Sequence, residues 1–190
     1  LLESQIVSRD NIQSATRIYN DRDGGIWVAL RNGQTYRYNN DLDRFDLVMD
    51  LASCLGRDIR LYDIHPYPDG TILAGSSEGL FRYKNGKCDF LGLGGLIVES
   101  ISEAYGGGLW ICAGRKVYRS ENDGTSISIL EGIPETQYIT TLDTDTRLFL
   151  GTFAEGIFVY EHSTCRTTHL TGLPYVPVRS LVTSRKGNIL

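Results

Sequence analysis

The sequence has 190 residues, 41% apolar and 22% charged, which is the balance of a soluble globular protein with a sizeable core. Its formal net charge is −4, and lysine and arginine are spread singly, which argues against the clustered basic surface of a nucleic-acid-binding protein. No apolar run approaches the roughly 18 residues of a membrane span, and the first residues lack a signal-peptide pattern, so we expect any leader or anchor outside this sequence.

A unit of about forty residues recurs along the chain, and each copy opens with two apolar residues three positions apart. The spacing of three breaks the alternation of a half-buried strand. It therefore predicts an innermost strand that is packed on both faces or that carries a bulge. The pairs are Ala15 and Ile18, Leu61 and Ile64, Val98 and Ile101, Ile139 and Leu142, and Val178 and Leu181.

A turn rich in glycine and aspartate follows each pair, and three further strands follow the turn. The second strand carries a large residue, which is Trp27, Leu73, Trp110, Phe149 or Leu190. The third strand presents residues two apart, mostly aromatic, which we expect to pack between repeats: Tyr36 and Tyr38, Phe81 and Tyr83, Tyr118 and Ser120, Phe158 and Tyr160. A weaker fourth strand is expected at 45–49, 87–90, 126–130 and 166–170.

Four strands per repeat, with no window of helical periodicity, predict an all-β fold of four-stranded antiparallel β-propeller blades. We expect complete blades at 11–50, 58–92, 96–131 and 137–171, the outer strand of a preceding blade at 1–10, and a truncated blade at 176–190. Missing blades would leave edge strands unpaired. The chain is therefore expected to be a propeller fragment that forms an open arc or pairs its ends with a second copy, as a homodimer.

The four cysteines have no Cys-x-x-Cys pair, so the spacing indicates neither a metal site nor a redox motif. An even number of cysteines permits disulfides in an exported protein, but four in 190 residues do not make a disulfide scaffold, and we expect Cys54, Cys88, Cys112 and Cys165 to be free thiols. Cys112 occupies the position of small residues in the other repeats, namely Ala29, Gly75 and Gly151, which predicts a buried apolar role for its side chain.

Several stretches carry a recognisable repeat motif: Asp69-Gly70, Gly79-Leu-Phe-Arg-Tyr83, Leu150-Gly-Thr152 with Glu155-Gly156, and Val178-Arg-Ser-Leu181 with Lys186-Gly-Asn-Ile-Leu190. The motif resembles the two-component regulator propeller repeat of bacterial hybrid two-component histidine kinases. The resemblance covers nearly the whole chain. It implies a periplasmic sensor that responds to oligosaccharides, with further blades, a following β-domain, a membrane helix and a cytoplasmic kinase as partners in the same parent chain.

In a propeller, the turns between second and third strands share one face with the segments that lead into the innermost strands. Polar side chains on that face suit sugar hydroxyls, aromatic rings suit pyranose faces, and arginine suits acidic groups. For any single residue the alternative is a solvated turn, and Tyr62, Tyr67 and Tyr105 are expected to serve packing or turns. The ligand-binding candidates are Gln13, Arg31, Asn32, Arg60, Ser77, Glu78, Arg115, Lys116, Tyr138, Glu155, Tyr175 and Arg179.

Catalytic motifs are not evident in the sequence. The three histidines, His65, His162 and His169, lack metal-ligand spacing, and Asp21 with Asp23 lacks the later acidic ligand of a calcium loop. No phosphate loop or nucleophile elbow occurs, so we predict no catalytic residue, metal or cofactor. We expect a non-catalytic sensor, and the alternatives are a propeller lyase or glycosidase and a protein-interaction scaffold.

Overall fold

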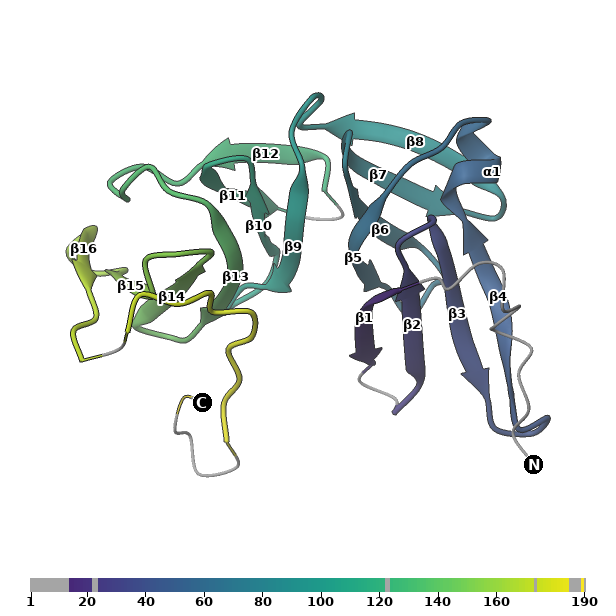
Figure 1. Ribbon diagram of the computed structural model, residues 1–190, viewed down its shortest axis with the longest axis horizontal. Helices are drawn as coiled ribbons and strands as arrows, with labels where there is room; N and C mark the ends of the chain where they lie inside the picture. The colour runs from purple at the N-terminus through teal and green to yellow at the C-terminus, as the bar shows by residue number, and fades with distance from the viewer. Residues whose placement is uncertain (1–13, 22–23, 122–123, 173, 185–188, 190) are drawn as a thin grey trace.

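The structure, a computed structural model, describes residues 14–21, 24–121, 124–172, 174–184 and 189. This part of the chain forms four antiparallel sheets of four strands, and in each sheet the strands follow chain order. The sheets succeed one another along an arc, with the first strand of each sheet innermost (Figure 1). Four-stranded sheets in this radial arrangement are blades of a β-propeller, which confirms the predicted fold class.

The first blade consists of β1 (Ala15–Asn20), β2 (Ile26–Leu30), β3 (Gln34–Asn39) and β4 (Arg44–Asp50). The second consists of β5 (Leu61–Pro66), β6 (Ile72–Ser76), β7 (Gly79–Lys84) and β8 (Lys87–Gly92). The third consists of β9 (Val98–Glu103), β10 (Leu109–Ala113), β11 (Lys116–Glu121) and β12 (Ser126–Ile129). The fourth consists of β13 (Tyr138–Asp143), β14 (Arg147–Thr152), β15 (Ile157–Glu161) and β16 (Arg166–His169).

The expected preceding strand at 1–10 lies outside the described residues. Within the expected truncated blade, an antiparallel bridge joins Thr183 and Ile189, and the backbone N–H of Val178 donates to the carbonyl of Thr152 at 2.9 Å. The buried side chain of Leu181 packs with Ile157 and Val159 of the fourth blade. The chain after β16 therefore lies against the fourth blade.

Each innermost strand carries a β-bulge, which explains the apolar spacing of three. The pairing shifts by one residue between Ala15 and Arg17, between Leu61 and Asp63, and at the equivalent points of β9 and β13. In the fourth repeat the predicted pair, Ile139 and Leu142, lies one residue too far toward the C-terminus. The residues that pair with β14 at the corresponding positions are Tyr138 and Thr141. Because these two are less typical of the motif, the apolar pattern alone selected the wrong register.

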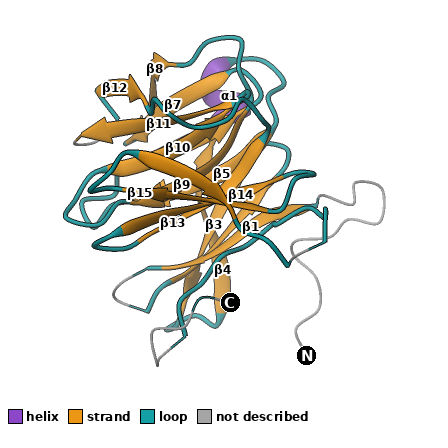
Figure 2. Cartoon of the chain, turned by 90° about the vertical axis from the view of Figure 1, so that its left-hand side faces the viewer, coloured by secondary structure: helices purple, strands orange, loops and turns teal. Residues whose placement is uncertain are grey.

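The insertion in the first repeat folds as a one-turn helix, α1 (Leu51–Leu55), at the outer rim beside β7 and β8 (Figure 2). The Asp50 carboxylate accepts from the Ser53 backbone N–H at its start, and Gly56 ends it in the left-handed conformation, φ 66°. The helix brings Cys54 to Cys88 of β8, with a Cα–Cα distance of 6.2 Å, and the two form a disulfide. The expectation of four free thiols is therefore wrong for this pair, since spacing along the sequence does not show proximity in the fold.

Apolar clusters fill the junctions between neighbouring blades. Trp27, Leu61 and Phe81 belong to the cluster between the first and second blades, and Trp110, Tyr138 and Phe158 belong to the one between the third and fourth. Each fully buried large apolar side chain contributes roughly 1.5–3 kcal/mol. The second-strand and third-strand residues therefore stabilise blade stacking. The sequence predicts this role for the third-strand residues, of which Phe81, Tyr118, Phe158 and Tyr160 are buried, whereas Tyr36, Tyr38 and Tyr83 are only partly buried.

The small residue that follows each large one has a steric cause. A Cβ on Gly75 would lie 2.7 Å from Cγ1 and 3.0 Å from the carbonyl oxygen of Val98, on the next innermost strand. A Cβ on Gly151 would likewise lie 3.0 Å from both Cγ1 and the carbonyl oxygen of Val178. Cys112 fills this position in the third blade, and burial raises the pKa of its thiol to about 12. Its predicted role as a small buried side chain is confirmed.

Candidate ligand-binding site

The turns between second and third strands lie beside the segments that lead into the innermost strands, so the predicted face exists. In the first two blades, the Arg31 backbone N–H donates to the carbonyl of Ser14, and the Ser77 N–H donates to that of Arg60, both at 2.9 Å. Gly114 and Phe153 make the same bonds in the third and fourth blades, to Ile97 and Gln137. One backbone contact therefore recurs in all four blades and defines the face.

Four of the predicted residues meet in an open depression of about 490 Å³ between the first and second blades, which we call the Arg31 depression. Its residues are Ser14, Arg31, Asn32, Asp58, Ile59, Arg60 and Ser77. Three of them, Ser14, Asp58 and Ile59, were not selected from the sequence. The turn from β2 to β3 supplies one side, and the segment after α1 supplies the other.

Local contacts hold most of these side chains in place. The Arg31 guanidinium lies over the ring of Tyr62, 5.5 Å from its centroid. The Asn32 amide donates to the Gln34 side chain at 3.0 Å. Among the described residues, no hydrogen bond or ion pair engages the Arg60 guanidinium. The depression therefore presents one guanidinium fixed against a ring and a second one open to a ligand.

Glu99 lies at the bulge of β9 and was missed by sequence reasoning. Burial raises its pKa, while the hydrogen bond from Gln137, 3.0 Å, and the charges of Arg31 and Arg179 act in the opposite direction. The bulge residues of β1, β5 and β13 are Thr16, Tyr62 and Ile139. Glu99 directly follows the first apolar position of its repeat, Val98, and this position in the repeat was the signal that could have found it.

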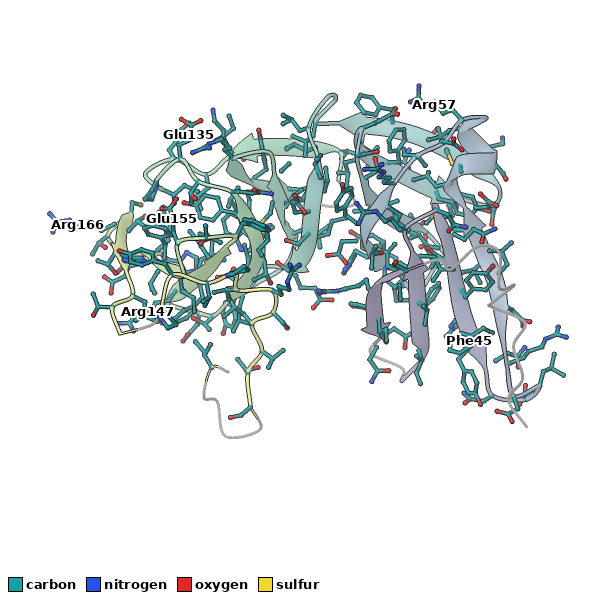
Figure 3. All side chains as sticks on the ribbon, viewed as in Figure 1. Phe45, Arg57, Glu135, Arg147, Glu155 and Arg166 are labelled. Carbon is teal, nitrogen blue, oxygen red and sulfur yellow. A yellow bond between two sulfur atoms is a disulfide. The ribbon has the colours of Figure 1, made fainter. Side chains whose placement is uncertain are left out.

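The remaining predicted residues are spread over the face and do not join the Arg31 depression. Glu78 pairs with Arg57 at 2.6 Å, Arg115 donates to the Glu135 backbone carbonyl at 2.8 Å, and Glu155 accepts from Thr136 at 2.7 Å. Figure 3 shows Arg57 at one side of the arc and both Glu135 and Glu155 at the other. Lys116, Tyr175 and Arg179 are exposed, and the Tyr175 ring stacks with His169, 5.9 Å between centroids.

Tyr138 does not reach the predicted face, which is a correction. Its side chain is 0% exposed, and its hydroxyl donates to the Pro134 carbonyl at 2.6 Å. It occupies the buried position that Leu61 and Val98 hold in other blades, because the apolar pair of this repeat begins one residue earlier than predicted. Gln13 lies outside the described residues.

Groups that could act on a substrate or hold an ion are sparse. Across the described ranges, no cluster of three histidine, cysteine or acidic side chains could hold a metal ion. His162 and Asp143 form a pair at 2.8 Å, but the Trp110 indole and the Tyr105 N–H also donate to Asp143. In the described part of the chain, no helix is long and apolar enough to cross a membrane.

No protein-family model matches the chain, and no curated protein matches it in sequence. Solved structures share its fold. The extracellular domain of the proposed hybrid two-component system BT4673 from B. thetaiotaomicron is 22% identical with a TM-score of 0.70, and the match covers 87% of this chain and 24% of that one. The corresponding domain of BT3049, from the same organism, is 18% identical with a TM-score of 0.70, and the match covers 90% and 26%.

A third structure, virginiamycin B lyase from Staphylococcus aureus in a catalytically inactive form with quinupristin, is 15% identical with a TM-score of 0.71. The match covers 96% of this chain and 64% of the lyase. The chain spans about a quarter of the length of the two sensor domains. These structures support the propeller fold, which occurs in sensors and in an enzyme, so the function rests on the site.

Proposed function

We propose that this chain is a non-catalytic, ligand-sensing part of a hybrid two-component sensor, that it binds an oligosaccharide, and that the parent protein signals across a membrane through a histidine kinase. The observation that carries the proposal is the Arg31 depression, where Arg31, Asn32, Arg60 and Ser77 meet between two blades. Guanidinium, amide and hydroxyl groups that line one depression can hydrogen-bond a ligand rich in hydroxyl or acidic groups.

An extracytoplasmic, periplasmic location agrees with two observations. The disulfide between Cys54 and Cys88 is of a kind that persists in oxidising compartments and is rare in the cytosol. The two sensor domains that share the fold are extracellular. The parent protein would then carry its membrane segment and kinase outside these 190 residues.

The place of the depression suggests how binding would be transmitted. Its walls come from two blades, so a ligand that contacts both favours one relative packing of these blades over another. A ligand shifts a conformational equilibrium only by its difference in affinity for the two states. Further blades, a following β-domain of the parent chain, or a second copy of the chain as a homodimer would be the partners that respond.

The alternative of an enzyme is favoured by one observation, the likeness in fold to a lyase. A lyase or glycosidase needs acids or histidines that converge on a bound substrate. The Arg31 depression contains a single carboxylate, Asp58, and no histidine. This composition favours binding over turnover, and a protein-interaction scaffold would differ from the sensor only in its partner.

Isothermal titration calorimetry against a panel of neutral and acidic oligosaccharides, with chromatographic analysis of products, tests the proposal. We expect binding without cleavage, weakened about tenfold by Arg60→Ala and unchanged in the control Arg166→Ala, which removes an exposed cation on β16 of the fourth blade. Cleavage of a bound oligosaccharide would establish the enzyme alternative. Binding of none of the panel, or equal binding by both variants, would contradict the proposal.

A further inference from the structure

A one-turn helix joins the first blade to the second at the outer rim. Helix α1 follows β4 of the first blade directly, and its Cys54 is bonded to Cys88 on β8 of the second blade. Among the described residues α1 is the only helix, and the only disulfide in that part of the chain attaches it. A helix of five residues is too short to be stable by itself in water, so its place depends on the contacts around it.

The first of these contacts connects α1 to the turn between β2 and β3, which forms one wall of the Arg31 depression. The Leu51 backbone N–H donates to the Gly33 carbonyl at 3.0 Å. Gly33 has a φ of 95°, and a Cβ there would lie 3.1 Å from the Ala52 nitrogen, so the turn packs directly on the helix. A shift of the helix start would therefore displace the backbone next to Arg31 and Asn32.

Side chains extend the same connection. The Asn32 amide, in the depression, donates to the Gln34 side chain at 3.0 Å, and the Gln34 amide donates to an Asp50 carboxylate oxygen at 3.2 Å. The other Asp50 oxygen accepts from the Ser53 N–H at 2.9 Å and so caps α1. A continuous series of hydrogen bonds thus runs from a ligand-binding candidate to the helix that carries Cys54.

The segment that leaves α1 forms the other wall of the depression. Asp58, Ile59 and Arg60 follow the helix within a few residues, and Ile59, which is buried, is anchored in the core between the blades. The Arg60 N–H donates to the Ser77 hydroxyl at 3.2 Å, and the Arg60 carbonyl accepts from the Ser77 N–H at 2.9 Å. Both walls therefore converge on α1, and the disulfide attaches α1 to the second blade.

The disulfide lies where a reductant can reach it. Cys54 and Cys88 are both partly exposed, and α1 lies at the outer rim (Figure 2). Exposed disulfides are the more readily reduced ones. One thiolate of a dithiol attacks a cysteine sulfur and releases the other cysteine, and the second thiol of the reagent then displaces the first cysteine from the mixed disulfide. Two electrons pass to the protein, each cysteine gains a proton, and the dithiol becomes a disulfide.

We propose that the disulfide between Cys54 and Cys88 positions both walls of the Arg31 depression, and that its reduction by a dithiol weakens ligand binding there. The inference rests on the proposed function in taking the Arg31 depression as the ligand site. It adds a redox input to that site, because reduction leaves α1 with noncovalent contacts alone. Neither cysteine lines the depression, so both are positioning residues.

Hydrogen–deuterium exchange tests the positioning without any ligand. The Leu61 and Ser77 amides make the backbone bonds that join the residues of the depression, and Gly114 and Phe153, in turns of the third and fourth blades, are the references. In excess dithiothreitol we expect the first two amides to exchange about tenfold faster by local opening, and the references to keep their rates. Unchanged rates at Leu61 and Ser77, or equal acceleration of all four amides, would overturn the proposal.

Calorimetry measures the consequence for binding, with maltotriose as the neutral probe and trigalacturonate as the acidic one. We expect the tighter probe to lose affinity about tenfold on reduction and to regain it on reoxidation. A variant with both Cys54→Ser and Cys88→Ser should bind as weakly as the reduced protein, with or without dithiothreitol. The control Cys165→Ser, at an exposed free thiol, should retain both the affinity and the response to reduction.

The outcomes separate this inference from the proposed function. Binding that Arg60→Ala weakens but reduction does not would retain the proposed function and reject the redox input. Binding of neither probe in either redox state would reject the redox input together with the proposed function, and exchange at Leu61 and Ser77 would still decide whether the disulfide positions the walls. If the double serine variant fails to fold, reduction and reoxidation of the unaltered chain provide the same comparison.

Discussion

The junction between the first and second blades and the junction between the third and fourth each contain a buried aspartate, in different surroundings. Asp63 lies in the middle of an innermost strand, where it accepts from the backbone N–H of Ile64 at 2.9 Å and of Ile101 at 2.8 Å and pairs with Arg17 at 3.2 Å. These contacts connect the first three blades through one carboxylate. Arginine stays charged over the whole accessible pH range, so this partner is permanent.

Asp143, at the third junction, lies at the end of its strand. It accepts from the Trp110 indole at 2.7 Å and the Tyr105 N–H at 2.9 Å, and His162 lies 2.8 Å away. A hydroxyl pair, Ser102 and Thr141, adds a contact between the same blades. A covalent link, the disulfide from α1 to β8, occurs only at the first junction among the described residues. The blades thus repeat the same strand arrangement, but the side-chain contacts that join neighbouring blades differ from one junction to the next.

The largest expected difference between the junctions comes from the disulfide. Cys88→Ser should lower the free energy of unfolding by about 3–4 kcal/mol, because the bond closes a long loop in the unfolded chain. Chemical denaturation with and without a reductant measures this change. Cys165→Ser, at an exposed free thiol, should have no effect. Equal stability of the oxidised and reduced protein would show that the first junction does not depend on the bond.

The second-largest expected difference between the junctions is in how the free energy of unfolding depends on pH. Burial raises the pKa of Asp63 to about 6 from an ordinary 3.8, although Arg17 and the two backbone N–H groups oppose the shift. Between about pH 4 and 6 the folded protein retains a proton that the unfolded chain has released. The free energy of unfolding should therefore fall as pH rises through this window, by roughly 2–3 kcal/mol, and level off above it.

The control for this pH profile is Asp63→Asn, which cannot titrate. The difference between the two profiles isolates Asp63 from other carboxylates, such as Asp69, whose pKa the hydrogen bond from Lys84 and those of Thr71 lower to about 2. Denaturation of both proteins at intervals from pH 4 to 8 provides the measurement. Parallel profiles would contradict a raised pKa for Asp63.

Much of the fold follows from local pattern. Glycine turns, large second-strand residues and third-strand aromatics each specify a hairpin, and stacking such hairpins produces blades. Contacts between distant residues were not predictable in this way: Cys54 and Cys88 meet because α1 returns to the rim of the second blade. The register of the fourth repeat failed because Tyr138 and Thr141 replace the expected aliphatic pair.

The site was predictable only in part, for a related reason. The turn positions of Arg31 and Ser77 follow from the repeat, so the face and part of the Arg31 depression were found. Glu99 was missed because a bulge turns its side chain out of the alternation of a regular strand.

A pair of substitutions compares the polar contacts directly. Asp63→Ala should cost about 2 kcal/mol at neutral pH, because it leaves two buried N–H groups without an acceptor and Arg17 without its partner. Thr141→Val, which removes one hydroxyl of a neutral pair at the third junction, should cost about 1 kcal/mol. Urea denaturation of both variants measures the difference. A larger cost for Thr141→Val would reverse the ranking of the junctions.

The smallest effect should come from the ion pair at the rim of the first junction. Arg57 and Glu78 lie 2.6 Å apart, but their side chains are 56% and 40% exposed, so water and salt screen the attraction. A double-mutant cycle with Arg57→Ala and Glu78→Ala should give a coupling energy below about 0.5 kcal/mol, and less in high salt. If the cycle instead gave more than about 1 kcal/mol, the rim contact would rank with the buried hydroxyl pair, and burial would no longer explain which contacts hold the blades together.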